Sequence, residues 1–373
     1  MKLQRDALYA GGFLGPFGGG VVTVLIPDLR DALHTTTGGA AATLTAYLIP
    51  FAVLQLVSGT LGERVGLARS IRSAYVVYAL ASAAVVLTTS LGPFLALRAL
   101  QGSANAFTTP LLVASLADAT PRATLGRAMA TFAAVQTIGV VMAPLIGGVA
   151  GAIDYRVAFI VPAVAALVLA ASPLPPHRRE NEATPTLRSA LTRRTARLSG
   201  FAAVAYMSSV GVGFLVALRA ADRFGLSSGI RGLLLAGFGF AGMLAGRPVG
   251  SLIDRRGALR VLGLGAAGSA LAIPLVGLAP SAVLLAATWT VAGVASQTIW
   301  ATVYTLAVDA APGNRAGAIS IVGACRFTGN ALAPVVWLPL YHAEAWLPFA
   351  AAGALLALLA AGSTRSPAPR PAA

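Results

Sequence analysis

Long apolar runs alternate along the chain with short segments that carry its charges. A helix needs roughly 20 apolar residues to cross a bilayer. The pattern predicts twelve such helices, over residues 8–28, 43–62, 70–91, 92–116, 126–150, 156–173, 199–220, 230–252, 259–279, 280–308, 315–338 and 343–362. The first run could be taken for a secretory signal, but no A-x-A-like cleavage pattern follows it and eleven further runs do. We therefore interpret it as the first membrane helix.

The longest polar stretch between apolar runs divides the predicted helices six and six. It is rich in proline and arginine, and basic residues are favoured beside the anionic inner leaflet. We expect an N-terminal six-helix bundle over residues 1–175, a cytoplasmic linker over 176–198 and a C-terminal six-helix bundle over 199–363. The Pro- and Ala-rich tail over 364–373 is typical of disorder.

Composition narrows the class of protein. Of the 373 residues, 57% are hydrophobic and 10% are charged, against about 25% charged in soluble domains. This excludes a soluble enzyme, a disordered protein and a nucleic-acid-binding module. The single cysteine, Cys325, excludes a disulfide framework and a cysteine-cluster metal site. The chain has no H-E-x-x-H, serine elbow or P-loop motif, so we expect no enzyme activity, no metal, no cofactor and no direct use of ATP.

The basic residues set the orientation. With the N-terminus in the cytoplasm, 20 of the 27 basic residues fall in cytoplasmic segments and 5 fall outside. Arg98 and Arg326 lie inside predicted helices. Because cytoplasmic loops carry an excess of basic residues, this bias places both termini in the cytoplasm.

The two halves repeat at a fixed offset. Gly59-Thr-Leu-Gly-Glu63-Arg64-Val-Gly66 lies 191 residues before Gly250-Ser-Leu-Ile-Asp254-Arg255-Arg-Gly257, and Asp118 lies 191 before Asp309. Since six is even, the repeats have the same orientation. Substrate sites in transporters built from such parallel repeats lie near the midplane, between the repeats.

These motifs resemble those of the major facilitator superfamily over nearly the whole chain. The loop after the second helix is similar to that family's G-x-L-x-D-R-x-G-R signature, with Glu63 in place of aspartate. The fourth helix carries Arg98-Ala-Leu-Gln101-Gly102, which is similar to R-x-x-Q-G. The fifth carries Gly139-Val-Val-Met-Ala143-Pro144-Leu-Ile-Gly147-Gly148 and resembles the family's antiporter motif, which marks export by proton antiport. The resemblance implies an all-α membrane fold of twelve transmembrane helices in two parallel six-helix repeats.

A second set of motif residues is expected to control the conformational change. Glycines 59, 62 and 66 should let helices approach closely. Pro144 and its neighbouring glycines should form a hinge or a seal on the fifth helix. Our hypothesis is that a latch closes the cytoplasmic gate in the outward-open state; the expected members are Glu63, Arg64, Asp118, Asp254, Arg255 and Asp309. Ordinary surface ion pairs are the alternative.

Polar and aromatic side chains inside the predicted helices indicate a substrate cavity, since charge at membrane depth usually faces one. The expected cavity residues are Tyr47, Gln55, Gln101, Asn105, Gln136, Gln297, Trp300, Tyr304, Arg326 and Asn330. None of the twelve acidic residues falls mid-helix. The best candidate for proton coupling is Asp28, near the outer end of the first helix, where it could face Arg98 and lose its proton more easily.

The sequence therefore predicts a secondary transporter in the bacterial inner membrane, a monomer that exports small amphipathic neutral or anionic compounds by proton antiport. The expected partners are the substrate, protons and the lipid bilayer, with no nucleic acid. Two alternatives remain: a facilitator or proton-coupled importer of a solute such as a sugar or carboxylate, and a transporter-like sensor.

Overall fold

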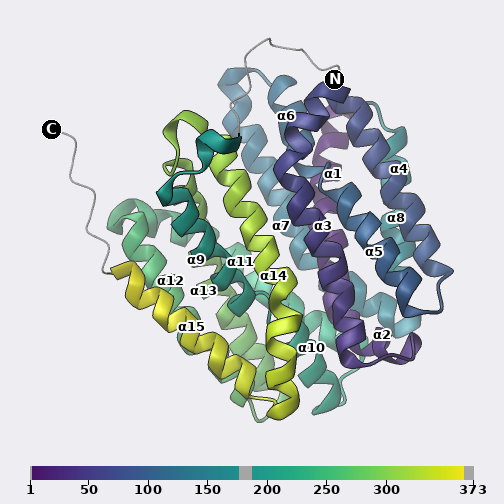
Figure 1. Ribbon diagram of the computed structural model, residues 1–373, viewed down its shortest axis with the longest axis vertical. Helices are drawn as coiled ribbons and strands as arrows, with labels where there is room; N and C mark the ends of the chain where they lie inside the picture. The colour runs from purple at the N-terminus through teal and green to yellow at the C-terminus, as the bar shows by residue number, and fades with distance from the viewer. Residues whose placement is uncertain (1, 176–186, 365–373) are drawn as a thin grey trace.

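The computed structural model describes residues 2–175 and 187–364, and every regular element within them is a helix. The predicted tail from residue 365, and the predicted linker up to residue 186, lie outside the described residues. We call residues 2–175 the first half and 187–364 the second half. Figure 1 shows the first half, in purple to blue, packed beside the second half, in teal to yellow.

Six helical segments make up the first half. They are α1 (Lys2–Gly20) with η1 (Val21–Leu25) and α2 (Ile26–Ala32), α3 (Thr37–Val65), α4 (Leu67–Val86), α5 (Leu91–Asn105) with α6 (Thr109–Asp118), α7 (Arg122–Ile153) and α8 (Val157–Ala171).

The second half repeats this order after the short helix η2 (Leu187–Ala190). Its segments are α9 (Arg193–Ser209) with α10 (Gly213–Asp222), α11 (Ser228–Arg256), α12 (Ala258–Leu278), α13 (Ala282–Val308), η3 (Pro312–Asn314) with α14 (Arg315–Ala343), and α15 (Leu347–Thr364). Helix α11 begins and ends 191 residues after α3, so the repeat predicted from short motifs extends to whole elements.

Capping residues fix where the helices begin and turn. The hydroxyls of Thr36, Thr192 and Ser281 each accept a hydrogen bond from a backbone N–H in the first turn of α3, α9 and α13, which satisfies a donor that the helix leaves open. Gly66 and Gly257 stand at matching turns, after α3 and after α11, with φ of 102° and 81°. Other residues adopt this left-handed region only with strain.

Eight helical segments of the described residues are long and apolar enough to cross a membrane, namely Leu3–Ala32, Thr37–Gly62, Arg127–Ile153, Arg193–Asp222, Ser228–Arg256, Ala258–Leu278, Ala282–Val308 and Pro312–Ala343. Helices α8 and α15 are apolar but shorter. The chain is thus an all-α membrane protein built from two repeats.

The first, fourth and seventh predicted helices are each interrupted in the structure. Three consecutive glycines end α1, and Pro110, which has no N–H, is the second residue of α6 and follows a turn at residues 106–108. Between α9 and α10, Trp337 Nε1 donates a hydrogen bond to the carbonyl of Met207 at 2.9 Å. The N–H of Gly211 then bonds the carbonyl of Tyr206 instead, and the helix is interrupted.

The halves meet along two pairs of helices, α7 with α11 and α3 with α14. We call the end where α1 and α9 begin the near end, and the end where α2 and α10 lie the far end. The backbones of α7 and α11 approach closely at Gly148 and Gly232. Helix α3 meets α14 through Phe51 and Phe327, and nearer the near end Leu56 of α3 packs against a small apolar cluster of the second half.

Candidate functional site

Two ion pairs join the halves at the far end. Asp28 of α2 pairs with Arg231 of α11 and accepts a hydrogen bond from the hydroxyl of Ser228 at 2.6 Å. The side chains of Asp28 and Arg231 are 22% and 6% exposed, so this pair is largely removed from water. The second pair, between Arg30 and Asp222 at 3.3 Å, is much more exposed.

The expectation that Asp28 faces Arg98 is wrong. Arg98 lies in the first half, with its Nη1 on Gln101 and its Nε on the carbonyl of Thr43. Helix α2 turns away at the break after α1, so it carries Asp28 to the far end and against the second half. The sequence predicted that Asp28 lies near the outer end of the first helix. It did not predict which neighbouring helix Asp28 faces, because that depends on the break in the helix.

The glycines of the antiporter-like motif on α7 are sites of close backbone approach. A Cβ at Gly139 would lie 2.5 Å from the carbonyl oxygen of Phe13, and one at Gly147 would lie 2.6 Å from that of Val21. Gly148 faces α11 of the second half, and a Cβ added at Gly148 would lie 2.9 Å from Gly232 Cα. The carbonyl of Pro144 also lies against Gly232, and α7 is uninterrupted at Pro144. The motif therefore forms a contact with α1 and, through Gly148, with the opposite half.

The three glycines at the near end of α3 have different surroundings. Gly62 lies against the side chain of Leu111, as expected, whereas a Cβ at Gly59 or Gly66 would meet nothing. Close helix approach is therefore wrong for Gly59 and Gly66, and Gly66 serves the turn through its positive φ.

The proposed latch is not assembled on the second half in this conformation. Among the described residues, the side chains of Asp254, Arg255 and Asp309 make no ion pair, and only the backbone carbonyl of Asp309 accepts a bond, from Arg194. The side chain of Glu63 lies outside the described part of the chain, while Arg64 and Asp118 have partners. The latch was expected in an outward-open state, so it stays a prediction.

Arg98 is the most buried charge of the first half, at 1% exposure. Gln101 joins it to Ser82 at 2.9 Å, and the guanidinium lies over the Tyr47 ring at 4.3 Å. Asn105 donates to the hydroxyl of Tyr47 at 2.7 Å and to the carbonyl of Gly15. Tyr47, Gln101 and Asn105 were expected to line the cavity; here they are buried and hold α1, α3 and α5 together.

Arg326 of α14 lies in a cage of aromatic rings. Its guanidinium carbon is 4.2 Å from the ring centre of Phe327, 4.3 Å from Trp300, 4.9 Å from Tyr206 and 5.5 Å from Tyr304. Its Nε is buried without a hydrogen-bond partner. Among the described residues Arg326 forms no ion pair, so its charge is balanced only by the faces of these rings.

Stacked rings connect the cage to the first half. Phe51 of α3 meets Phe327 edge-on at 4.8 Å, and Tyr47 stacks on Phe51 at 6.3 Å. Sequence reasoning missed Tyr206 and Phe327 as members of this cluster. Phe327 directly follows Arg326, but helical spacing alone places it on another face, and only the packing of α9, α13 and α14 brings these rings together.

The remaining predicted cavity residues are Gln55, Gln136, Gln297 and Asn330, all partly exposed. Asn330 lies one helical turn beyond Arg326, and Gln297 one turn before Trp300. Gln55 Oε1 is buried and unpaired. Their role as cavity residues stays a prediction.

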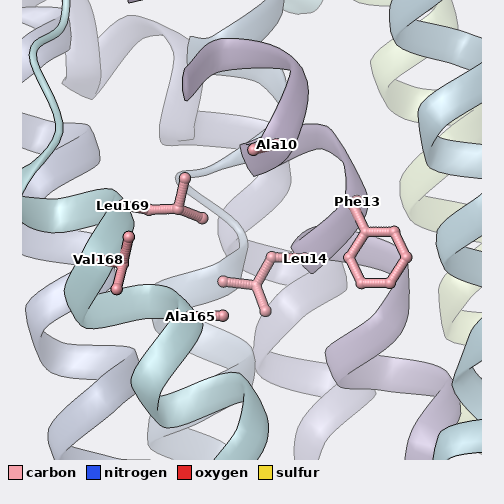
Figure 2. Close-up of a pocket in the computed structure, with 6 residues that line it drawn as sticks. All are labelled: Ala10, Phe13, Leu14, Ala165, Val168 and Leu169. Atoms are coloured by element: carbon pink, nitrogen blue, oxygen red, sulfur yellow. The ribbon is translucent and has the colours of Figure 1, made fainter. Parts of the chain in front are cut away.

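A cavity of about 400 Å³ lies between α1 and α8, and Figure 2 shows its lining of Ala10, Phe13, Leu14, Ala165, Val168 and Leu169. These side chains offer no polar group. The cavity therefore lacks the chemistry to orient a polar substrate. The described residues also contain no cluster of His, Cys, Asp and Glu that could hold a metal ion.

Comparison with known families identifies one match. The family model described as the Major Facilitator Superfamily matches the chain twice, over residues 8–201 and 198–373. The two matches correspond to the two repeats.

Curated relatives include transporters and efflux proteins. The uncharacterized MFS-type transporter EfpA of Mycobacterium tuberculosis is 29% identical over 150 residues, which are 40% of this chain and 28% of EfpA. The drug efflux pump JefA of the same organism is 29% identical over 129 residues, 34% of this chain and 25% of JefA. The tetracenomycin C resistance and export protein of Streptomyces glaucescens is 27% identical over 128 residues, 34% of this chain and 24% of that protein. The chain thus spans about a quarter of the length of these relatives.

Solved structures share the fold over almost the whole chain. A mutant of the nucleoside transporter NupG superposes with a TM-score of 0.81 at 16% identity, covering 97% of this chain and 100% of that one. A bacterial homolog of the human lysosomal transporter Spinster, in an inward-facing and occupied conformation, gives 0.77 at 17% identity, covering 96% and 95%.

Proposed function

Because the chain belongs to the Major Facilitator Superfamily, we propose that it is a secondary transporter that exports small amphipathic neutral or anionic compounds in exchange for protons. Transport proceeds by rocking of the first half against the second, so that a central site opens to one end at a time. The relatives that carry names of function are a drug efflux pump and an antibiotic export protein, which favours export.

The single observation that carries this proposal is the Asp28–Arg231 pair. It joins the halves at the far end, it is largely buried, and one of its members is a carboxylate. Protonation of Asp28 removes the negative charge that Arg231 and Ser228 hold in place. A charge-assisted hydrogen bond contributes about 1.5–3 kcal/mol, so proton binding there favours opening of the far end.

The arrangement in the membrane follows from the same scheme. All twelve helical segments cross the inner membrane of a bacterium, the near end faces the cytoplasm and the far end faces outward. The first bundle is then residues 1–175, the linker 176–198 and the second bundle 199–363, and the protein works as a monomer.

Import is the second candidate. A facilitator or proton-coupled importer of a small sugar or carboxylate would use Arg98 and Arg326 as substrate clamps. Arg326, which has no ion-pair partner among the described residues, favours this reading as much as export of an anion. Direction of transport separates the two.

Everted membrane vesicles with an acidified lumen test the proposal, with a pH-sensitive dye reporting proton release. We expect a transported compound to discharge the proton gradient in wild-type vesicles, and Asp28→Asn to reduce the rate about tenfold or more. Asp31→Asn is the matched control, because the side chain of Asp31 is exposed and its partner among the described residues is the neighbouring Arg30. Proton-driven export is contradicted if the compound accumulates without the proton gradient, or if it accumulates only in right-side-out vesicles.

A further inference from the structure

The guanidinium of Arg326 lies against four aromatic rings, and its N–H donors have no acceptor among the described residues. Guanidinium donors point outward in the plane of the group, whereas its faces stack on aromatic rings. Four ring centres lie within 5.5 Å of the guanidinium carbon. The rings come from α9, α13 and α14, and none of them accepts a conventional hydrogen bond, so Arg326 can still offer its fork of N–H donors to a ligand.

No acidic side chain in the described part of the chain pairs with that fork. Arg326 forms no ion pair or hydrogen bond with the described residues, and its Nε is buried and unsatisfied. An unpaired buried donor costs about 1–3 kcal/mol, more for a charged group. Because a charge at membrane depth is costly, an ionisable side chain that is kept there without a partner indicates a functional site.

The cage is also open to a ligand. Tyr304 is 37% exposed, and Arg326, Trp300, Tyr206 and Asn330 are each partly exposed. Part of the surface of each of these side chains is therefore accessible to a molecule from outside the cage. Asn330, one turn along α14, adds an amide with both donor and acceptor groups.

We propose that this cage binds an aromatic carboxylate: the carboxylate pairs with the edge of Arg326 and the ring stacks among Trp300, Tyr206 and Phe327. A carboxylate matches the two parallel N–H donors of a guanidinium, and offset or edge-on ring contacts suit an aromatic body. An organic cation of the same shape is repelled by Arg326. The inference rests on the proposed function in that the ligand is taken to be the transported compound.

The location of the cage supports a role in the transport cycle. Phe51 of the first half closes one side through its edge contact with Phe327, and Thr45 nearby donates to the carbonyl of Ala331 at 2.7 Å. A ligand stacked on Phe327 therefore lies where α3 and α14 meet. Rocking of the halves changes the Phe51 side of the cage while Arg326 and its rings stay on the second half.

Equilibrium binding to the purified full chain tests the proposal without any membrane gradient. The ligands are naphthoate, naphthamide and naphthylmethylammonium, which share one ring system and differ in charge. Binding is read by thermal stabilisation and by quenching of tryptophan fluorescence. We expect naphthoate to bind wild type about tenfold or more tighter than naphthamide, and the ammonium compound to bind weakest.

Arg326→Gln is expected to remove the preference for naphthoate over naphthamide. Arg260→Gln, an exposed arginine at the start of α12, is the matched control and should keep it. The inference is overturned if Arg326→Gln keeps the preference, or if wild type binds the ammonium compound as tightly as naphthoate. If Arg326→Gln does not fold, the comparison of the three compounds on wild-type protein still tests the inference. Binding with the expected preference but without proton-coupled flux would contradict the proposed function and leave this inference standing.

Discussion

Arg98 and Arg326 are held in different ways, and the difference bears on their roles. Arg98 has a hydrogen-bonded shell of Gln101, Ser82 and the carbonyl of Thr43, so it stabilises the first half. Arg326 has only aromatic faces around it. Polar residues at helical spacing predict both arginines as membrane-embedded charges, but the partner of each depends on helices distant in sequence, which spacing does not reveal.

The prediction at this scale concerns Arg231→Gln, which leaves Asp28 without its cation. We expect the closed far end to lose about 1.5–3 kcal/mol of stability, and hydrogen exchange of the α2 amides to rise about tenfold or more. Arg30→Gln, which removes the exposed pair with Asp222 and Asp31, should cost only about 0–1 kcal/mol. Equal exchange in both variants would show that the Asp28–Arg231 pair does not hold the far end.

At the scale of elements, the contact between α7 and α11 depends on the absence of side chains. A Cβ at Gly232 would fall on the carbonyl of Pro144 and lie 3.0 Å from Gly148 Cα, whereas a Cβ at Gly246, on the same helix, would meet nothing. Gly148 was identified from the sequence because it belongs to the antiporter-like motif on α7. Gly232 belongs to no such motif, and only the packing of the two halves shows that it is the partner of Gly148.

We therefore predict opposite effects for two substitutions on α11. Gly232→Ala should force the helices apart at the far end and lower the midpoint of thermal unfolding. Gly246→Ala should leave that midpoint unchanged or raise it, because alanine favours a helix by about 1 kcal/mol over glycine. Thermal unfolding of the two variants in the same detergent checks this, and a lower midpoint for Gly246→Ala alone would contradict it.

At the scale of the whole molecule, the sequence predicted the repeat, the helix order and the family. Apolar runs and a fixed offset can be recognised in the sequence without knowing which residues are in contact. The breaks at residues 106–108 and 210–212 were not predictable in the same way. The second arises because Trp337 takes the carbonyl of Met207, a contact between residues 130 positions apart. The aromatic cage was found only in part for the same reason: Trp300, Tyr304 and Arg326 show polar spacing, but Tyr206 does not.

The most direct test of alternating access measures both ends of the molecule at once. Spin-label pairs at exposed, repeat-related positions would report the near end (Thr60 with Ser251) and the far end (Leu87 with Leu278), with Cys325→Ser removing the native cysteine. Asp28→Asn removes the negative charge of the pair with Arg231, as a bound proton would. We predict that the far-end distance is longer and the near-end distance shorter in Asp28→Asn than in wild type, while Asp31→Asn leaves both distances unchanged. Two distances that change in the same direction, or that do not differ between Asp28→Asn and wild type, would contradict proton-driven rocking of the two halves.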